Sequence, residues 1–377
     1  MKVWATNTDI STAGAMIPVL ELLRSKGHEV ITLAEPASRG FAAFSGGGFE
    51  PVPFEPFPNY DDAMKALLEK QKPEVIIVGI ASGDQGTEKS VLKIGPKLGI
   101  PVVALVDTWP NDWLYWYVDR NDRGEVALYN RARAICVPDD LAIETMIKYG
   151  FDKAKLFATG NPEWDLLAKF RSERDKYRKE MRGKWGIGED KFVMLFATTS
   201  KLDDPDQDKP GAVGWFGTSE KDIIRECLRA IQHNSSVHLV IRQKPGWSTE
   251  TITKLMTEIP CGAVLDTEPY ERGWPSVLAV DVVVGLATLV LQNAAILGVP
   301  AISYQPGRDP KEDSFSPNKI GITVSIYEHG VLEKLICDAR QKSKEQFLTE
   351  LQARAKRIEL VHNATERRYS LIIGMCK

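Results

Sequence analysis

The sequence predicts an α/β protein made of two doubly wound parallel-sheet domains. Short runs of β-branched and other apolar residues alternate with helical segments almost from the first residue. The connections between them are short, which favours right-handed crossovers that cover both faces of a parallel sheet. A highly charged stretch divides the alternation into two series, and 377 residues are enough for two domains of ordinary size.

The first domain is predicted over residues 1–165. Apolar periodicity marks its helices, and three of them are followed by a glycine, namely Gly27, Gly99 or Gly150. Its strands are short apolar runs such as VIIVG at 75–79, typical of strands buried on both faces. We expect strands at 2–6, 28–33, 49–54, 75–79, 101–106, 134–137 and 156–159, and helices at 15–26, 61–70, 87–98 and 140–149.

A charged connector and a second domain follow. Residues 166–190 have a helical period but carry many charges, so we expect an exposed connector. The second domain is expected over residues 191–355, with strands at 192–197, 237–242, 263–265, 281–284 and 301–304 and helices at 222–232, 249–258, 289–297 and 333–358. A final helical segment, residues 356–377, is expected to pack back on the first domain.

Composition and charge argue against several classes of protein. A net charge of −3 without a basic stripe argues against nucleic-acid binding. The sequence has no apolar run of about 18 residues, which argues against an integral membrane segment. The first residues are typical of a strand rather than of a signal peptide, so the expected location is the cytoplasm. Five widely spaced cysteines without a C-x-x-C pair, and histidines without ligand spacing, predict no metal site.

The segment 281–306 is predicted to be a strand–turn–helix–strand unit with an anion-binding turn. Gly285 ends a β-branched run, and Thr288 precedes a helix that is closed by Gly298. A glycine turn at the carboxyl end of a parallel strand, opening onto a helix N-terminus, is a common site for phosphate groups. The alternative is that this unit is only one layer of the α/β core.

Polar residues follow several other predicted strands. Ligands of open α/β sheets bind outside the carboxyl ends of the strands, so these residues are expected to line the binding site. They are Asn7, Asp9, Ser11, Thr12, Ser82, Asp84, Asp107 and Trp109 in the first domain, and Thr199, Ser200, Lys201, Arg242 and Lys244 in the second. The positive charges of the two lysines and the arginine could neutralise a diphosphate group without a metal ion. Alternatively, both lysines are solvated surface residues.

The order of these motifs resembles the GT-B superfamily, which contains nucleotide-sugar glycosyltransferases and non-hydrolysing UDP-N-acetylglucosamine 2-epimerases. The resemblance is carried by GNPEWD at 160–165, the charged connector, the second domain with LGVP at 297–300, and the N-terminal segment 8–27 with Pro18 in its helix. It implies two Rossmann-like domains that face each other across a cleft. The C-terminal domain would then hold the nucleotide, and the N-terminal domain would face the sugar or the acceptor.

Two residues depart from the pattern of this superfamily. Its members usually carry a glutamate that binds the ribose hydroxyls at the place of Asn293, where the neutral amide makes a weaker hydrogen bond. They often carry a histidine before the proline where this chain has Lys244. The resemblance implies a nucleotide site made of Thr199, Ser200, Lys201, Arg242, Lys244, Gly285, Thr288 and Asn293, and an acceptor side made of Ser11, Thr12, Ser82 and Trp109.

Three aspartates are the candidate catalytic bases. We rank Asp9 first and Asp107 second, with Asp84 as the third candidate, because all three follow strands of the first domain. Each of them could instead cap a helix or stabilise a turn. The aromatic cluster that begins with Trp109 is a sugar-stacking surface, a packed loop or a homodimer contact.

The expected function is transfer of a sugar from a nucleotide sugar, UDP-linked by resemblance, to a small-molecule or glycan acceptor, without a metal or cofactor. The first alternative is a UDP-N-acetylglucosamine 2-epimerase. The second is a nucleotide-sugar-binding subunit without catalytic activity. The sequence has no P-loop, no G-x-S-x-G elbow and no G-x-G-x-x-G turn after its first strand, which argues against phosphoryl transfer, α/β-hydrolase chemistry and NAD binding.

Overall fold

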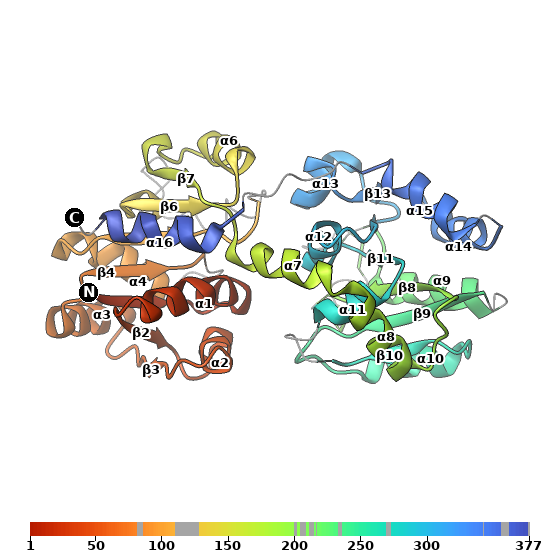
Figure 1. Cartoon of the computed structure of the whole chain (residues 1–377), viewed down its shortest axis with the longest axis horizontal. Coiled ribbons are helices and arrows are strands. Elements are labelled where there is room, and N and C mark those ends of the chain that lie inside the picture. Colours follow the sequence, from red (N-terminus) through yellow and green to blue (C-terminus); the bar gives the residue numbers. More distant parts are fainter. Residues whose placement is uncertain are drawn as a thin grey trace. The chain divides into compact units, whose positions relative to one another are not determined.

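The computed structural model divides the chain into two compact units. Unit 1 comprises Met1–Leu166 with Glu359–Lys377, and unit 2 comprises Leu167–Ile358. Each unit has its own sheet and core (Figure 1). The residues that the structure describes are 1–80, 86–109, 128–199, 202–203, 209–210, 215, 217–232, 236–268, 273–341, 343–355 and 362–375.

Unit 1 contains a parallel sheet with the strand order β3-β2-β1-β4-β5-β6-β7. Its strands are β1 (Lys2–Thr6), β2 (Glu29–Ala34), β3 (Val52–Pro53), β4 (Val75–Val78), β5 (Val102–Leu105), β6 (Ala134–Val137) and β7 (Leu156–Ala158). The chain runs outward from β1 to one edge and then continues from β4 to the other. The switch point, where ligands bind in such sheets, therefore lies between β1 and β4.

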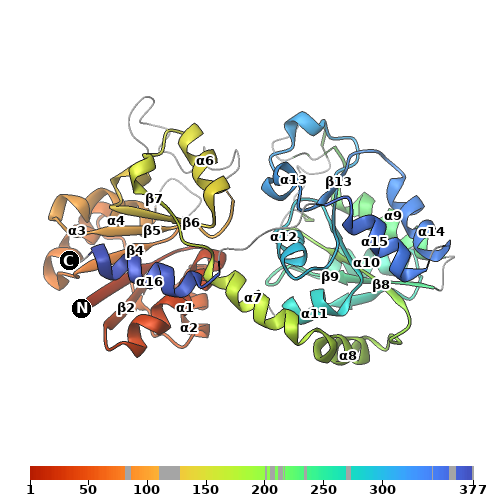
Figure 2. The same ribbon diagram turned by 45° about the horizontal axis from the view of Figure 1, so that its top comes forward.

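The helices of unit 1 cover the sheet. They are α1 (Ile10–Ser25), α2 (Arg39–Gly46), α3 (Tyr60–Gln71), α4 (Thr87–Ile94), α6 (Asp140–Lys148) and α16 (Ala364–Met375). Helix α7 (Pro162–Ser172) begins in unit 1 and continues into unit 2. The last helix of the chain, α16, lies along α1 (Figures 1 and 2), and its Ile372 joins Met16 and Leu20 in the core.

Two elements of unit 1 differ from the predictions. Helix α2 was not predicted, although Ser38 caps it by accepting a hydrogen bond from the Phe41 N–H, and Phe44 is buried beneath it. Helix α1 begins at Ile10, earlier than predicted, because the Asp9 carboxylate accepts a hydrogen bond from the Ser11 N–H. The polar residues after β1 are thus partly the first turn of a helix.

Unit 2 contains a parallel sheet with the strand order β10-β9-β8-β11-β12-β13. Its strands are β8 (Phe192–Ala197), β9 (Val237–Arg242), β10 (Val264–Asp266), β11 (Val282–Gly285), β12 (Ala301–Tyr304) and β13 (Val324–Ile326). Its helices are α8 (Arg174–Trp185), α9 (Glu220–Gln232), α10 (Glu250–Glu258), α11 (Gly273–Ala279), α12 (Leu289–Ile296), α13 (Ser316–Ile320), α14 (Val331–Gln341) and α15 (Lys344–Gln352). The switch point lies between β8 and β11.

Several features of unit 2 correct the predicted elements. Strand β13 and the helices α11 and α13 were not predicted. The long helix expected over residues 333–358 is divided into α14 and α15, because Ser343 starts a new helix by accepting a hydrogen bond from the Gln346 N–H. Both parallel sheets nevertheless have the doubly wound order that the sequence predicted, so the predicted fold class is confirmed.

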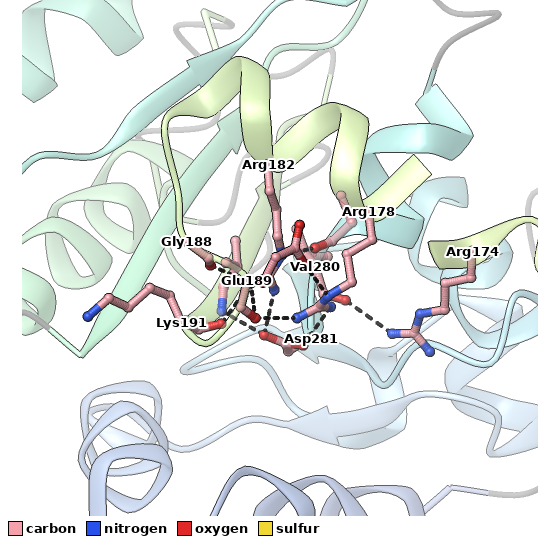
Figure 3. Close-up of polar contacts among 10 residues, drawn as sticks. Arg174, Arg178, Arg182, Gly188, Glu189, Lys191, Val280 and Asp281 are labelled. Carbon is pink, nitrogen blue, oxygen red and sulfur yellow. Dashed lines mark hydrogen bonds and ion pairs between the residues drawn. The ribbon is translucent and has the colours of Figure 1, made fainter. Parts of the chain in front are cut away.

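The charged segment before β8 is anchored in unit 2 by a buried arginine (Figure 3). Helix α8 packs against α11, and Arg182 is fully buried between them and the start of β8. The guanidinium of Arg182 forms a 3.0 Å ion pair with Asp281 and donates to the backbone carbonyls of Ala279, Gly188, Glu189 and Lys191. Because each nitrogen of the Arg182 guanidinium has a hydrogen-bond acceptor, this charged side chain can be buried. The expectation that this segment is an exposed connector therefore fails at Arg182.

Candidate functional site

The carboxyl ends of β8, β9 and β11 in unit 2 meet at one place. Gly285 pairs with Ala197, and the Lys244 N–H donates to the Thr198 hydroxyl at 2.9 Å. The loops that follow these three strands are therefore in contact. Most of the residues predicted to bind the nucleotide lie here, at the switch point of the sheet.

Gly285 is required by close packing at this point. A Cβ atom on Gly285 would lie 3.0 Å from the Ala197 carbonyl oxygen and 3.0 Å from the Thr288 methyl group. Both distances are tighter than about nine in ten real Cβ contacts, so a side chain here would require the neighbouring atoms to shift by a few tenths of an ångström. The glycine keeps the backbone of these two loops together.

Helix α12 begins at this site. Thr288 is its N-cap, and the hydroxyl accepts a hydrogen bond from the Val290 N–H at 3.4 Å. Its N-terminus places a partial positive charge next to Gly285. Asn293 is 5% exposed and lies among the buried residues of the same helix. The role of Asn293 in ribose binding therefore stays a prediction.

The two cations of the β9 end have different environments. Arg242 is buried, with its guanidinium 2.7 Å from the Asp266 carboxylate, and it also donates to the Ser276 hydroxyl and the Glu268 carbonyl. Its charge is therefore matched inside the unit. Lys244 is only half-buried, and its ammonium group lies 5.9 Å from the centre of the Trp247 ring. Lys244 is the better candidate for a diphosphate contact.

Glu220 is a residue of this site that the sequence analysis missed. It is 1% exposed and accepts hydrogen bonds from the Thr199 N–H and hydroxyl, at 2.8 and 3.0 Å. Burial raises the pKa of Glu220 to about 7, while the hydrogen bonds from Thr199 and the charge of Lys244 oppose the rise. No local motif marks Glu220, because its position follows from how α9 packs on the sheet.

In unit 1, two of the three candidate bases lie together. The Asp9 carboxylate accepts hydrogen bonds from the Ser11 N–H at 2.9 Å and from the Ser11 hydroxyl at 2.8 Å. Asp107 keeps some exposed surface, but burial of its carboxyl raises its pKa. The nearby hydroxyls of Ser11 and Thr12 oppose that rise in pKa, and the charge of Asp9 adds to it. Asp9 and Asp107 are therefore close enough for the charge of Asp9 to act on Asp107, and Ser11 lies near both.

A buried glutamate contacts Thr8, the residue before Asp9. Glu88 is fully buried and accepts hydrogen bonds from the N–H and the hydroxyl of Thr8, the latter at 2.9 Å. Burial raises the pKa of Glu88. Like Glu220, it lies in the first turn of a helix and could not be recognised from local sequence.

The backbone on both sides of Asp107 is held by residues distant in sequence. The Asn161 amide donates to the Asp107 carbonyl at 2.6 Å, and the buried Arg368 guanidinium donates to the Val106 carbonyl at 3.0 Å. Trp109 is buried, donates its indole N–H to Asp139 at 2.6 Å and packs on Trp164. These contacts favour the packed-loop alternative for Trp109.

Four predicted site residues fall outside the described part of the chain, namely Ser82, Asp84, Ser200 and Lys201. Among the described residues, no group of three or more histidines, cysteines or acidic residues could hold a metal ion. None of the described helices has the length and apolarity needed to cross a membrane.

Solved structures resemble this chain over almost its whole length. The UDP-GlcNAc 2-epimerase of Neisseria meningitidis, bound to UDP-GlcNAc, is 15% identical, with a TM-score of 0.67 over 100% of this chain and 99% of that one. Staphylococcus aureus MnaA with UDP is 14% identical, with a TM-score of 0.69 over 98% and 95%. Acinetobacter baumannii MurG is 15% identical, with a TM-score of 0.56 over 99% and 100%. No protein-family model and no curated protein matches the sequence.

These similarities show that the chain has the GT-B fold, which confirms the resemblance found in the sequence. They also correct the expected function. UDP-GlcNAc 2-epimerases predominate among the similar structures, including those of Methanocaldococcus jannaschii and Rickettsia bellii. This finding contradicts the glycosyltransferase expectation and favours the epimerase alternative. The motifs used for the sequence prediction describe the fold, which both kinds of enzyme share.

Proposed function

We propose that the chain is a nucleotide-sugar 2-epimerase that acts on a UDP-linked N-acetylhexosamine. In this proposal, unit 2 binds the nucleotide and unit 1 supplies the proton transfers. The choice of nucleotide is supported by similar structures that hold UDP-GlcNAc or UDP. The choice of reaction is supported by the residues of unit 1.

The observation that carries the proposal is that Asp9 and Asp107 lie close together, with Ser11 near both. Inversion at C2 requires loss of the C2 proton, and because no carbonyl lies beside C2, the electron pair of that bond forms a C1–C2 double bond as UDP leaves C1. Return of UDP to C1 and of a proton to the other face of C2 completes the reaction. Such a reaction needs one group that accepts a proton and one that donates it. Burial and the charge of Asp9 raise the pKa of Asp107. Two neighbouring carboxyls in different environments can divide these roles.

The residues of unit 2 suit the diphosphate of the same substrate. Lys244 supplies a positive charge, and the N-terminus of α12 after Thr288 supplies backbone dipoles directed at an anion. Gly285 allows the β8 and β11 loops to approach each other there. A lysine and a helix N-terminus can bind a diphosphate without a metal, so we expect activity to persist in EDTA.

NMR of UDP-GlcNAc after incubation with the protein tests this proposal. We expect the C2 epimer to form until equilibrium is reached, without accumulation of free UDP. Free UDP with a released or transferred sugar would contradict epimerisation. Binding of UDP-GlcNAc with no chemical change would instead indicate a nucleotide-sugar-binding subunit.

A further inference from the structure

Glu220 and Thr199 form a two-point contact at the carboxyl end of β8. Glu220 is the first residue of α9, and each of its carboxylate oxygens accepts a hydrogen bond from Thr199. One bond comes from the Thr199 backbone N–H and the other from its hydroxyl. The contact therefore fixes both the backbone and the side chain of Thr199 beside the switch point.

A similar contact, with both hydrogen bonds to one carboxylate oxygen, occurs in unit 1. Thr8 follows β1 by two residues, as Thr199 follows β8, and both its N–H and its hydroxyl donate to Glu88 in the first turn of α4. The two sheets thus use a buried glutamate to hold a threonine after the central strand. Its recurrence indicates that the contact serves the loop at the switch point.

Unlike the contact in unit 1, the contact in unit 2 lies near groups that could bind a diphosphate. The positive charge of Lys244 lowers the pKa of Glu220. The Lys244 N–H donates to the hydroxyl of Thr198, the neighbour of Thr199. The next strand, β11, meets β8 where Gly285 pairs with Ala197. Glu220 therefore lies behind the loop that a diphosphate at Lys244 would contact.

We propose that Glu220 is a positioning residue of the nucleotide site, which holds Thr199 in place and takes up a proton when a diphosphate binds beside Lys244. This inference rests on the proposed function only because that function places the nucleotide in unit 2. Glu220 acts through Thr199 and through the local charge, without touching the reacting atoms.

The charges around Glu220 give the direction of the effect. In the described residues, Lys244 after β9 lowers the pKa of Glu220 and Asp203 after β8 raises it, while burial brings the pKa to about 7. A bound diphosphate would pair with Lys244 and add negative charge. Both changes favour the protonated carboxyl, so binding and protonation strengthen each other.

Titrations with UDP-GlcNAc at several pH values test this inference, because its diphosphate does not titrate near neutral pH. For the wild type, we expect the affinity to fall roughly tenfold between about pH 6 and about pH 8. Glu220→Gln keeps a group that can hydrogen bond to Thr199 but cannot ionise, so its affinity should not change with pH. Glu220→Ala loses both contacts to Thr199 and cannot ionise, so it should bind about tenfold more weakly than Glu220→Gln, and its affinity should not change with pH.

Asp222→Asn is the matched control, because Asp222 is an exposed carboxylate two residues further along the same helix turn. It should keep the pH dependence of the wild type. The inference is overturned if Glu220→Gln keeps that dependence or if Glu220→Ala binds as tightly as Glu220→Gln does. If the wild type itself binds no UDP-GlcNAc, the proposed function fails, and this inference fails with it.

Discussion

Arg182 Nη2 lies 3.0 Å from Asp281 Oδ2, and each side chain has 1% or less of its surface exposed. The same Asp281 carboxylate accepts a hydrogen bond from the Val193 N–H at 2.9 Å and forms an ion pair with Arg178 (Figure 3). Asp281 precedes β11 and Val193 belongs to β8. The pair thus aligns the two strands whose opposite ends form the candidate nucleotide site.

Loss of this arginine should destabilise unit 2 strongly. Arg182→Ala removes one of the two arginines paired with the buried Asp281 carboxylate and the donors to four backbone carbonyls. We expect the free energy of unfolding of unit 2 to fall by about 3–5 kcal/mol. Denaturant unfolding measures this change. Lys179→Ala, at an exposed position of the same helix, should change stability by less than about 0.5 kcal/mol. A small effect of Arg182→Ala would contradict the anchoring role.

Gly285→Ala should separate the loops of the nucleotide site. The added methyl would lie 3.0 Å from the Ala197 carbonyl oxygen, so we expect a loss of about 1–3 kcal/mol in stability together with weaker UDP binding. Gly183→Ala is the control, because a Cβ at Gly183 in α8 meets nothing within 4 Å. That variant should be more stable by about 0.5–1 kcal/mol. Unchanged UDP affinity in Gly285→Ala would show that the glycine serves packing alone.

The raised pKa of Glu220 predicts how stability changes with pH. Its folded-state pKa of about 7 exceeds the ordinary value of 4.5, so the folded state holds the proton more tightly. This contribution to stability is complete below about pH 4.5 and is lost as the pH rises through about 7. Glu220→Gln should therefore gain stability relative to the wild type between pH 5 and pH 8, by on the order of 3 kcal/mol. Parallel stability curves for the two proteins would argue against the shifted pKa.

Local sequence was sufficient to predict the fold class and the 281–306 unit. The β-branched run that becomes β11 and the helix predicted from Leu289, observed as α12, needed only periodicity and glycine signals. Gly298 ends that helix with a φ of +77°, a conformation that glycine adopts readily. Such signals come from neighbouring residues and do not depend on the rest of the chain.

The candidate site could be predicted only in part, because its electrostatics depend on residues distant in sequence. Arg242 was predicted to bind a diphosphate, but Asp266, 24 residues later, already pairs with it. Glu220 becomes part of the site through contact with Thr199, 21 residues earlier. Arg182 belongs to a charged segment, and only the packing of α8 shows that it is buried. Charge patterns do not reveal which charges are matched in the interior.

Exchange of the C2 proton tests the central claim most directly. UDP-GlcNAc is incubated in deuterated water with the wild type, with Asp107→Asn, and with Asp62→Asn, whose replaced carboxylate is exposed on α3. We expect the wild type and Asp62→Asn to introduce deuterium at C2 as the epimer forms. Asp107→Asn should slow this exchange at least about 100-fold while binding UDP as tightly as the wild type. Bound UDP-GlcNAc that keeps its C2 proton in the wild-type protein would contradict the assignment as a 2-epimerase.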